Sequence, residues 1–320
     1  MSSEFTLIND YFHWDTRHPS VLMGVGDDAA ILQPPEKKHL IVSSDTFIEG
    51  VHFPKGTAAH AIGHKALAVN LSDLAAMGAD PAWFTLALTL PEVDDTWLHD
   101  FSSGLKELAN QFSIDLVGGD TTRGSLSITI TAIGFADEKQ VLQRSTAVAG
   151  DSIYVTGELG AAAAGLAHLQ ERVQLDERTA EQCQQQLDYP IPRNAESVII
   201  RKFASSCIDI SDGFLADLQH ILDASELGAV IQLQDLPIMK SLKSYDSTEI
   251  QNFALRGGDD YELLFTIPET NVDAFEQAIQ QSNMMCYCVG HIDAAIHGIQ
   301  SDNQQVLSAT GYNHFNENTS

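Results

Sequence analysis

Cysteine is scarce in this chain, and long apolar runs are missing from it. The four cysteines among 320 residues, Cys183, Cys207, Cys286 and Cys288, are too few and too unevenly spaced for a disulfide framework. No unbroken apolar stretch is long enough to span a bilayer, and the first residues lack the basic and apolar regions of a secretory signal. We therefore expect a protein of the reducing cytoplasm that does not enter a membrane.

Basic residues are also few. The chain has 17 Lys and Arg against 44 Asp and Glu, which gives a formal net charge of -27. This balance argues against a nucleic-acid partner, because neutralising phosphates requires basic patches. An acidic chain also repels a free nucleotide through its long-range field. Most of the acids are interpreted as solvated surface, and any nucleotide is expected to arrive as a metal complex, so that activity depends steeply on Mg²⁺.

Several well-known catalytic motifs are absent. The sequence has no Walker loop, no protein-kinase His-Arg-Asp and Asp-Phe-Gly set, no H-E-x-x-H and no G-x-S-x-G. Residues 24–29 match the dinucleotide fingerprint by letter, but Pro34 and Pro35 follow too soon for the helix that this fingerprint opens. A calcium loop starting at Asp209 fails because its fifth position is already Gly213.

What the chain does have is a series of carboxylates beside Gly, Ser or Thr, namely Asp27, Asp28, Asp45, Asp73, Asp120, Asp209 and Asp212. Two like charges ~4 Å apart repel by about 1 kcal/mol even in water. Mg²⁺ relieves such repulsion, since it prefers oxygen ligands and substrate phosphates. If these acids converge, the sequence predicts a magnesium-dependent, phosphate-handling enzyme. Taken singly, each acid also suits a surface turn, a helix N-cap or a solvent-facing helix position.

The pattern of apolar residues predicts a mixed α/β protein. The length suggests about two domains, and a break near residues 147–151 divides the chain into an ATP- and metal-binding domain 1–148 and a second α/β domain 149–320. Periodicity predicts strands at 40–44, 83–90, 114–117, 126–134 and 153–156, and helices at 60–78, 95–112, 159–169 and 214–224.

The segment 118–123, Gly-Gly-Asp-Thr-Thr-Arg, is more specific than the other acidic segments. Paired glycines let backbone amides approach a phosphate, and Asp120 beside them could hold the metal on that phosphate. Arg123 or Arg144 could add positive charge. Gly-Gly-Asp recurs at 257–259, which hints weakly at an internal duplication.

The order of these motifs resembles that of the thiamine-monophosphate kinases. The resemblance extends over residues 24–315, and it rests on segments 24–29, 43–46, 65–79, 118–122, 208–213 and 257–262. It implies the two-domain fold of the aminoimidazole-ribonucleotide synthetases and selenophosphate synthetases, with the N-terminal sheet at the interface of a homodimer. It also implies transfer of the γ-phosphoryl group of ATP to thiamine monophosphate, giving thiamine diphosphate and ADP.

The same resemblance implies roles for individual residues. Several Mg²⁺ ions would be held by Asp28, Ser43, Ser44, Asp45, Asp73, Asp120, Asp209 and Asp212. ATP, the co-substrate, would contact Gly119, Asp120, Arg144 and Ser211. Thiamine monophosphate would contact His52, Asp259 and Tyr312. The carboxylates expected to matter most for catalysis are Asp45, Asp73, Asp120 and Asp212.

One position departs from the family pattern, and two other functions stay open. The family usually has Glu where this chain has Asp259, which is one methylene shorter, so a substrate contact there would need a shift, a water bridge, or Asp260 or Glu262 as a substitute. The acceptor in this reaction is already an anionic oxygen, so the chemistry needs positioning and charge neutralisation rather than a general base. The alternatives are another ATP-dependent synthetase of the superfamily and a non-catalytic binder of Mg-ATP or thiamine phosphate.

Overall fold

The protein, seen here in a computed structural model, is described over residues 4–311. Contacts between residues divide the chain into two units. The first unit comprises the residues up to 74 together with 79–141. The second unit comprises residues 75–78 and the residues from 142 onward. The sequence break expected at residues 147–151 lies a few residues beyond this division. Within residues 4–311, no helix is both long and apolar enough to cross a bilayer.

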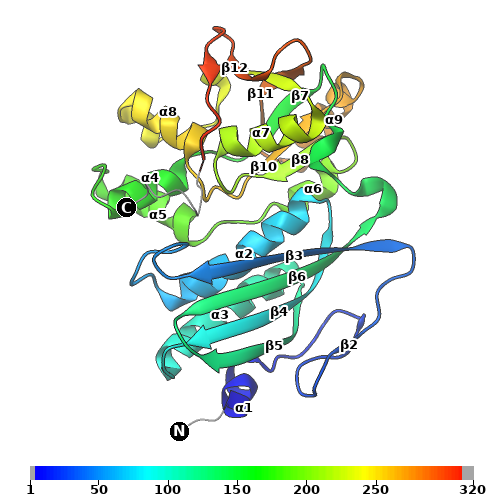
Figure 1. The fold of residues 1–320 in the computed structure, drawn as a ribbon, viewed down its shortest axis with the longest axis vertical. Coiled ribbons are helices and arrows are strands. Elements are labelled where there is room, and N and C mark those ends of the chain that lie inside the picture. Colours follow the sequence, from blue (N-terminus) through cyan, green and yellow to red (C-terminus); the bar gives the residue numbers. More distant parts are fainter. Residues whose placement is uncertain (1–3, 312–320) are drawn as a thin grey trace. The chain divides into compact units, whose positions relative to one another are not determined.

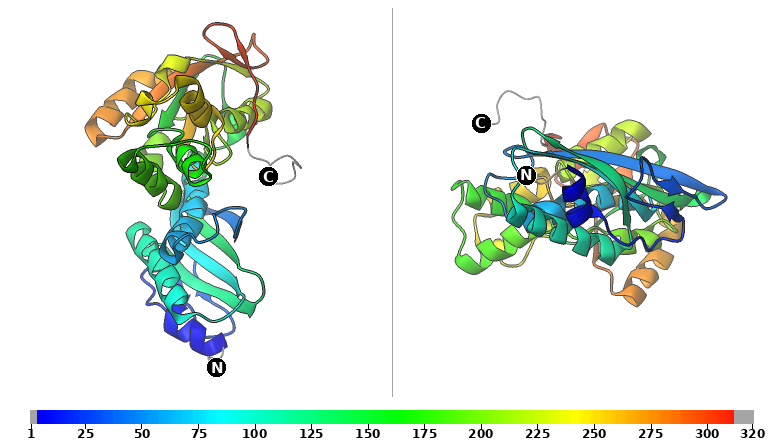
Figure 2. Two further views of the ribbon diagram at one scale, coloured as in Figure 1. Left: turned by 90° about the vertical axis from the view of Figure 1, so that its left-hand side faces the viewer. Right: turned by 90° about the horizontal axis from the view of Figure 1, so that it is seen from below.

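The first unit is built on a sheet with strand order β3-β6-β4-β5, with bounds β3 (Lys38–Ile48), β6 (Ser127–Asp137), β4 (Asp80–Leu90) and β5 (Asp115–Arg123). β3 and β4 each pair antiparallel with β6, and β5 pairs parallel with β4. Two helices, α2 (Ala59–Ala76) and α3 (Asp95–Phe112), cover one face of this sheet (Figures 1 and 2).

The two helices differ as their sequences predict. α2 is apolar nearly all round and is buried along most of its length, as expected of a core helix. α3 is amphipathic, and the Asp94 side chain caps it by accepting from the backbone N–H groups of Thr96 and Trp97. The helices approach closely, because a Cβ on Gly63 or on Gly104 would lie about 2 Å from a carbonyl oxygen of the facing helix.

Alternation along β3 and β6 separates the two faces of this sheet. Ile128 and Ile130 of β6 are buried on the helix-covered face. On the other face hydroxyl groups pair across the strands: Ser44 Oγ lies 2.9 Å from Thr131 Oγ1, and Thr46 Oγ1 lies 2.8 Å from Thr129 Oγ1. An N-terminal segment completes the unit, with α1 (Glu4–Leu7), a π-helical turn η1 (Ile8–Phe12), β1 (Val21–Met23) and β2 (Ile31–Leu32).

The second unit contains a larger sheet with strand order β13-β12-β9-β11-β7-β10-β8, antiparallel except between β12 and β9. Its strands are β7 (Ser152–Thr156), β8 (Ser206–Asp209), β9 (Gly228–Ile231), β10 (Leu263–Ile267), β11 (Cys286–Asp293), β12 (Gly298–Ser301) and β13 (Val306–Leu307). Its helices are α4 (Ala161–Leu169), α5 (Glu177–Asp188), α6 (Asn194–Ile200), α7 (Phe214–Ser225), α8 (Ser247–Arg256) and α9 (Val272–Ser282). Short 3₁₀ turns are η2 (Glu138–Gln140), η3 (Arg144–Thr146), η4 (Leu233–Asp235), η5 (Leu242–Ser244) and η6 (Glu269–Asn271).

Two expectations from the sequence need correction. The strand expected at 114–117 is longer than predicted, because β5 continues through the segment 118–123 to Arg123. Gly119 is required there by close packing: a Cβ at this position would lie 1.9 Å from the carbonyl oxygen of Leu86 on β4. The second Gly-Gly-Asp, at 257–259, lies in the connection between α8 and β10, so the two tripeptides occupy different local structures.

Candidate active site

Asp45 of β3 and Asp73 of α2 face one another in the first unit. Asp45 is on the helix-covered side of the sheet, where Ser43, two positions earlier on the same face, donates a short hydrogen bond to Asp73 Oδ2. Burial, and then the charge and hydrogen bonding of Asp73, raise the pKa of Asp45 to about 7. The chain therefore brings two carboxylates together at a place where ionising both is costly.

This pair suits a hard cation. A divalent ion beside both carboxylates would favour their charged forms and replace the proton that burial otherwise holds on Asp45. Within residues 4–311, no group of at least three His, Cys, Asp or Glu side chains is arranged to hold a metal ion. Two carboxylates would leave most of the coordination positions of a Mg²⁺ ion to phosphate oxygens and water, an arrangement common for this ion.

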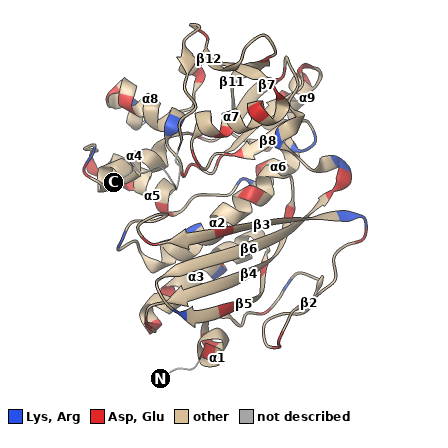
Figure 3. Cartoon of the chain, viewed as in Figure 1, with Lys and Arg blue, Asp and Glu red and all other residues tan. Residues whose placement is uncertain are grey.

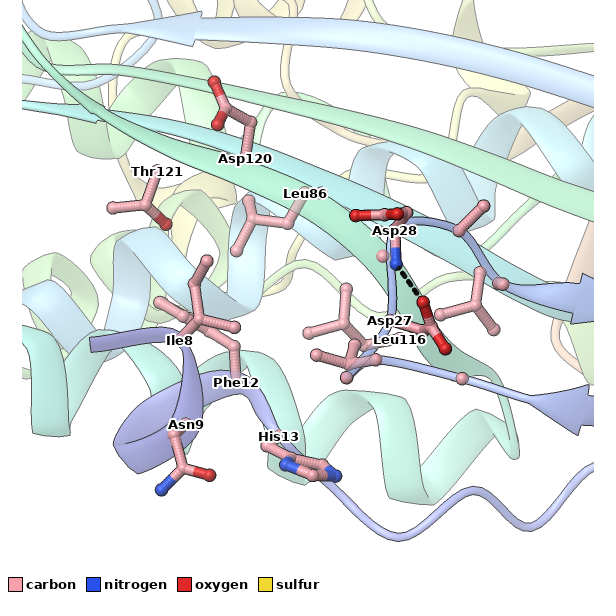
Figure 4. A pocket seen from close by; sticks show the side chains of 18 of the residues that line it. Ile8, Asn9, Phe12, His13, Asp27, Asp28, Leu86, Leu116, Asp120 and Thr121 are labelled. Atoms are coloured by element: carbon pink, nitrogen blue, oxygen red, sulfur yellow. Dashed lines mark hydrogen bonds between the residues drawn. The ribbon is translucent and has the colours of Figure 1, made fainter. Parts of the chain in front are cut away.

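A second acidic region of the same unit lines a cavity of about 560 Å³. Asp27 and Asp28 reach it from the turn after β1, and residues 118–121 reach it from β5 (Figure 4). The backbone N–H of Asp28 donates to Asp27 Oδ1 at 2.8 Å, which fixes this turn. Apolar side chains, which include Phe12 and Leu116, also line this cavity, so it combines carboxylates with surface suited to a flat, apolar group.

The pairing register shows how β3 and β5 present their polar residues. Asp120 of β5 lies directly beside Ala87 of β4. Ala87 in turn lies beside Thr129 of β6, and Thr129 lies beside Thr46 of β3. Asp120 and Ser44 therefore belong to the face that carries the hydroxyl pairs, whereas Asp45 belongs to the face that α2 covers. Figure 4 shows Asp120 extending away from the apolar residues below it.

His52, expected to contact thiamine monophosphate, lies just after β3. Its Nδ1 accepts a hydrogen bond from the backbone N–H of Ile48 at 3.0 Å, and its ring stacks on Phe47 with centroids 5.2 Å apart. These contacts fix both the tautomer and the plane of the ring, because an accepting Nδ1 leaves the proton on Nε2.

In the second unit, Ser211 and Asp212 lie in the turn between β8 and α7. Asp209 ends β8 and is 4% exposed, whereas Ser211 and Asp212 are partly exposed. The Asp217 side chain, one turn into α7, accepts hydrogen bonds from the backbone N–H groups of Ser211, Asp212 and Gly213, each at 3.1 Å. Asp217 was not among the residues predicted from the sequence, although an acid in the first turn of a helix, just after a Ser-Asp-Gly turn, is a recognisable signal.

Asp259 belongs to the segment that pairs with this turn. Its backbone N–H donates to Ser211 O at 2.9 Å, and that of Tyr261 donates to Ile210 O at 2.8 Å. Asp259 and Tyr261 both have positive φ, of 70° and 50°, which costs a non-glycine residue about 1 kcal/mol or more. The Tyr261 hydroxyl donates to Asp259 Oδ1 at 3.0 Å, a contact that the sequence did not reveal.

The two acids considered as substitutes for Asp259 are engaged within the protein. Asp260 accepts from the backbone N–H of Gly160 at 3.0 Å through each of its oxygens. Glu262 is bound by Arg193 through two hydrogen bonds, of 2.5 and 2.6 Å, and by Thr156 Oγ1 at 2.6 Å. Neither carboxylate is therefore available to replace Asp259.

The remaining predicted residues are placed as follows. Arg144 is exposed in η3 of the second unit, where its carbonyl oxygen accepts from Ser225 Oγ at 3.0 Å. Tyr312 lies outside the described residues. Acidic side chains are spread over helices, strands and loops of each unit (Figure 3), so most of them do not belong to these groups.

Both parts of the chain match a known protein family. Residues 26–136 match "AIR synthase related protein, N-terminal domain", and residues 148–299 match "AIR synthase related protein, C-terminal domain". The chain is 45% identical over 318 residues to the thiamine-monophosphate kinase of Escherichia coli (strain K12), an alignment that covers 98% of each chain. This chain belongs to the thiamine-monophosphate kinase family. The family membership and the mixed α/β fold predicted from the sequence are thereby confirmed.

Solved structures of thiamine-monophosphate kinases agree with this assignment. The crystal structure of the enzyme from Stenotrophomonas maltophilia K279a matches with a TM-score of 0.85 at 42% identity, covering 90% of this chain and 93% of that chain. AaThiL complexed with AMPPCP and TMP matches with a TM-score of 0.78 at 30% identity, covering 91% of this chain and 92% of that chain.

Proposed function

We propose that this chain transfers the γ-phosphoryl group of ATP directly to the phosphate of thiamine monophosphate, giving thiamine diphosphate and ADP. Near-complete alignment with thiamine-monophosphate kinases supports the reaction, as does the relative complexed with AMPPCP and TMP. Within this structure, the observation that carries the proposal is the contact between Asp45 and Asp73, two acids that favour a bound cation. Phosphoryl transfer needs such charge neutralisation more than it needs covalent help.

The proposed magnesium ligands are Asp28, Ser43, Ser44, Asp45, Asp73, Asp120, Asp209 and Asp212. When bound, Mg²⁺ would offset the charge of the phosphates and orient them for in-line transfer. The proposed contacts of ATP are Gly119, Asp120, Arg144 and Ser211. Those of thiamine monophosphate are His52, Asp259 and Tyr312. The reaction proceeds without a general base because the attacking phosphate oxygen is already ionised.

We also propose a homodimer that joins through the N-terminal sheets, at the exposed apolar side chains of the edge strand β3. Leu40, Val42 and Ile48 of this strand are 50%, 60% and 43% exposed. A second copy would cover these side chains. We further propose that the protein acts in the cytoplasm, in keeping with its few cysteines.

A product assay tests the function. Purified protein is incubated with ATP, thiamine monophosphate and excess Mg²⁺, with and without EDTA, and the products are separated by chromatography. Thiamine diphosphate and ADP should appear together and vanish with EDTA. ADP alone would favour a synthetase with another acceptor, and binding of Mg-ATP without turnover would favour a non-catalytic binder.

A further inference from the structure

The turn at residues 211–213 encloses a carboxylate of the protein itself. Three successive backbone N–H groups point at one oxygen, Asp217 Oδ2, and each N···O distance is 3.1 Å. Asp217 is 2% exposed, and its own backbone N–H donates back to Gly213 O at 3.0 Å. The turn and the first turn of α7 (Phe214–Ser225) therefore form one closed hydrogen-bonded unit.

Successive amides at a helix N-terminus ordinarily form a binding site for an external anion such as a phosphate. Here the carboxyl group of Asp217 already occupies this position, and burial keeps solvent out of the site. A substrate phosphate in the same place would have to displace this carboxylate. The backbone N–H groups of residues 211–213 consequently stabilise the turn through Asp217 and are not available to bind substrate.

The turn held by Asp217 also sets the position of its neighbour. Ser211 O accepts from the backbone N–H of Asp259, and a Cβ on Gly258 would lie 2.4 Å from the same oxygen. Gly213 has φ of 121°, and a Cβ there would lie 2.7 Å from the carbonyl carbon of Arg256. A shift of the turn would therefore be passed directly to Asp259.

We propose that Asp217 is a positioning residue for phosphoryl transfer, occupying the amide cradle in place of a phosphate and thereby fixing Ser211, Asp212 and Asp259. The inference rests on the proposed function for the roles of those three residues. It assigns no contact with substrate to Asp217 itself. A positional error of about 1 Å at a reacting centre can lower a rate about 100-fold, so a residue that only holds a turn can matter this much.

The test uses Asp217→Ala with Asp223→Asn as the matched control. Asp223 lies near the other end of α7, is exposed, and contacts Gln219 Nε2 at 2.7 Å. We expect Asp217→Ala to lower kcat/KM for Mg-ATP about 100-fold. Sodium formate should partly restore the lost activity by refilling the cradle, whereas sodium chloride at equal ionic strength should not. Asp223→Asn should behave as wild type under all three conditions.

Two outcomes would overturn the proposal. One is wild-type kcat/KM in a folded Asp217→Ala protein. The other is a loss that formate does not restore and that equals the unfolded fraction measured by circular dichroism. If the alanine variant does not fold, Asp217→Asn serves instead, since its amide oxygen keeps the shape without the charge. The proposal then requires a lowered kcat/KM in the folded asparagine variant, and an unchanged value refutes it.

Failure of the proposed function would be recognised separately. If the wild-type protein forms no thiamine diphosphate, calorimetric binding of Mg-ATP replaces the kinetic measurement. Weaker binding by Asp217→Ala that formate restores still supports the positioning role. Equal binding by the two proteins rejects it.

Discussion

One buried acidic site in each unit shows two different ways of neutralising a carboxylate. In the second unit, Glu262 is held by Arg193 and by Thr156 Oγ1, so the protein supplies the donors. In the first unit, Asp45 faces Asp73, and burial with this neighbour raises its pKa to about 7. The first kind of carboxylate needs nothing from outside the chain. A carboxylate of the second kind, such as Asp45, becomes fully ionised at neutral pH only when a cation binds. A candidate metal ligand therefore differs from a structural acid in lacking a positive partner within the protein.

Asp45→Asn should have the largest effect and should separate function from stability. Removing a metal ligand from a phosphoryl-transfer site should lower kcat by about 1000-fold, or about 4 kcal/mol of activation free energy. The same change removes a repulsive charge, so the metal-free variant should unfold at an equal or higher denaturant concentration than wild type. Steady-state kinetics and urea unfolding with EDTA check both statements.

The control for this variant is Asp137→Asn, at the end of β6, where the carboxylate lies 3.8 Å from Lys38 at the surface. It should leave kcat unchanged. Full activity of Asp45→Asn at saturating Mg²⁺ would show that Asp45 is not a metal ligand. The proposed difference between Asp45 and Glu262 would then be wrong.

Arg193→Met tests the opposite case. It leaves Glu262, whose side chain is 6% exposed, without its guanidinium partner, and breaking a buried pair in this way should lower the free energy of unfolding by about 3 kcal/mol. Urea unfolding of the variant measures the loss. Because replacing both charges by apolar groups is often neutral, the double variant Arg193→Met/Glu262→Leu should recover much of the stability. A double variant no more stable than Arg193→Met would show that packing, rather than the pairing of charges, matters here.

The stability of the metal-free protein should depend on pH through Asp45. Its pKa is about 7 in the folded protein and near 3.8 when unfolded, so the folded state binds the proton more tightly. The contribution of this group is fully present below about pH 4 and is lost as pH rises to about 7. Urea unfolding in EDTA, compared between wild type and Asp45→Asn, isolates this part of the pH dependence.

Saturating Mg²⁺ should reverse that trend, because the cation binds the ionised carboxylate and its affinity therefore rises with pH up to about 7. Identical pH profiles for wild type and Asp45→Asn in EDTA would contradict the raised pKa.

Local patterns in the sequence predicted much of this fold. The helix expected at 95–112 is α3 (Asp95–Phe112), because its apolar stripe is regular and Asp94 caps it. The strand expected at 126–134 corresponds to β6 (Ser127–Asp137), because its apolar residues alternate with polar ones. The extension of β5 through Gly119 was missed, since the need for glycine comes from Leu86 on a neighbouring strand, which local sequence does not reveal.

The candidate site likewise has features that the sequence predicted and features that it did not. Acid identities and the order of motifs pointed to the right family, but pairwise geometry did not follow from them. The contact of Asp45 with Asp73 needs a strand and a helix to pack together. The bond from Tyr261 to Asp259 depends on two residues with positive φ, a conformation that is uncommon for residues other than glycine.

Tyr261→Phe should have the smallest effect. It changes the surroundings of Asp259, a carboxylate intermediate between Glu262, which the protein itself pairs, and Asp45, which is a proposed metal ligand. Asp259 receives a hydroxyl donor from the protein, yet it is a proposed contact of thiamine monophosphate. Loss of one hydrogen bond to a charged group is worth about 1.5 kcal/mol, so KM for thiamine monophosphate should rise about tenfold while KM for ATP stays constant. Tyr154→Phe is the matched control, because its hydroxyl contacts Glu276 at 3.3 Å away from the proposed site, and it should change neither KM. If Tyr261→Phe changed KM for thiamine monophosphate and KM for ATP equally, Asp259 would instead have a structural role, as Asp260 and Glu262 do.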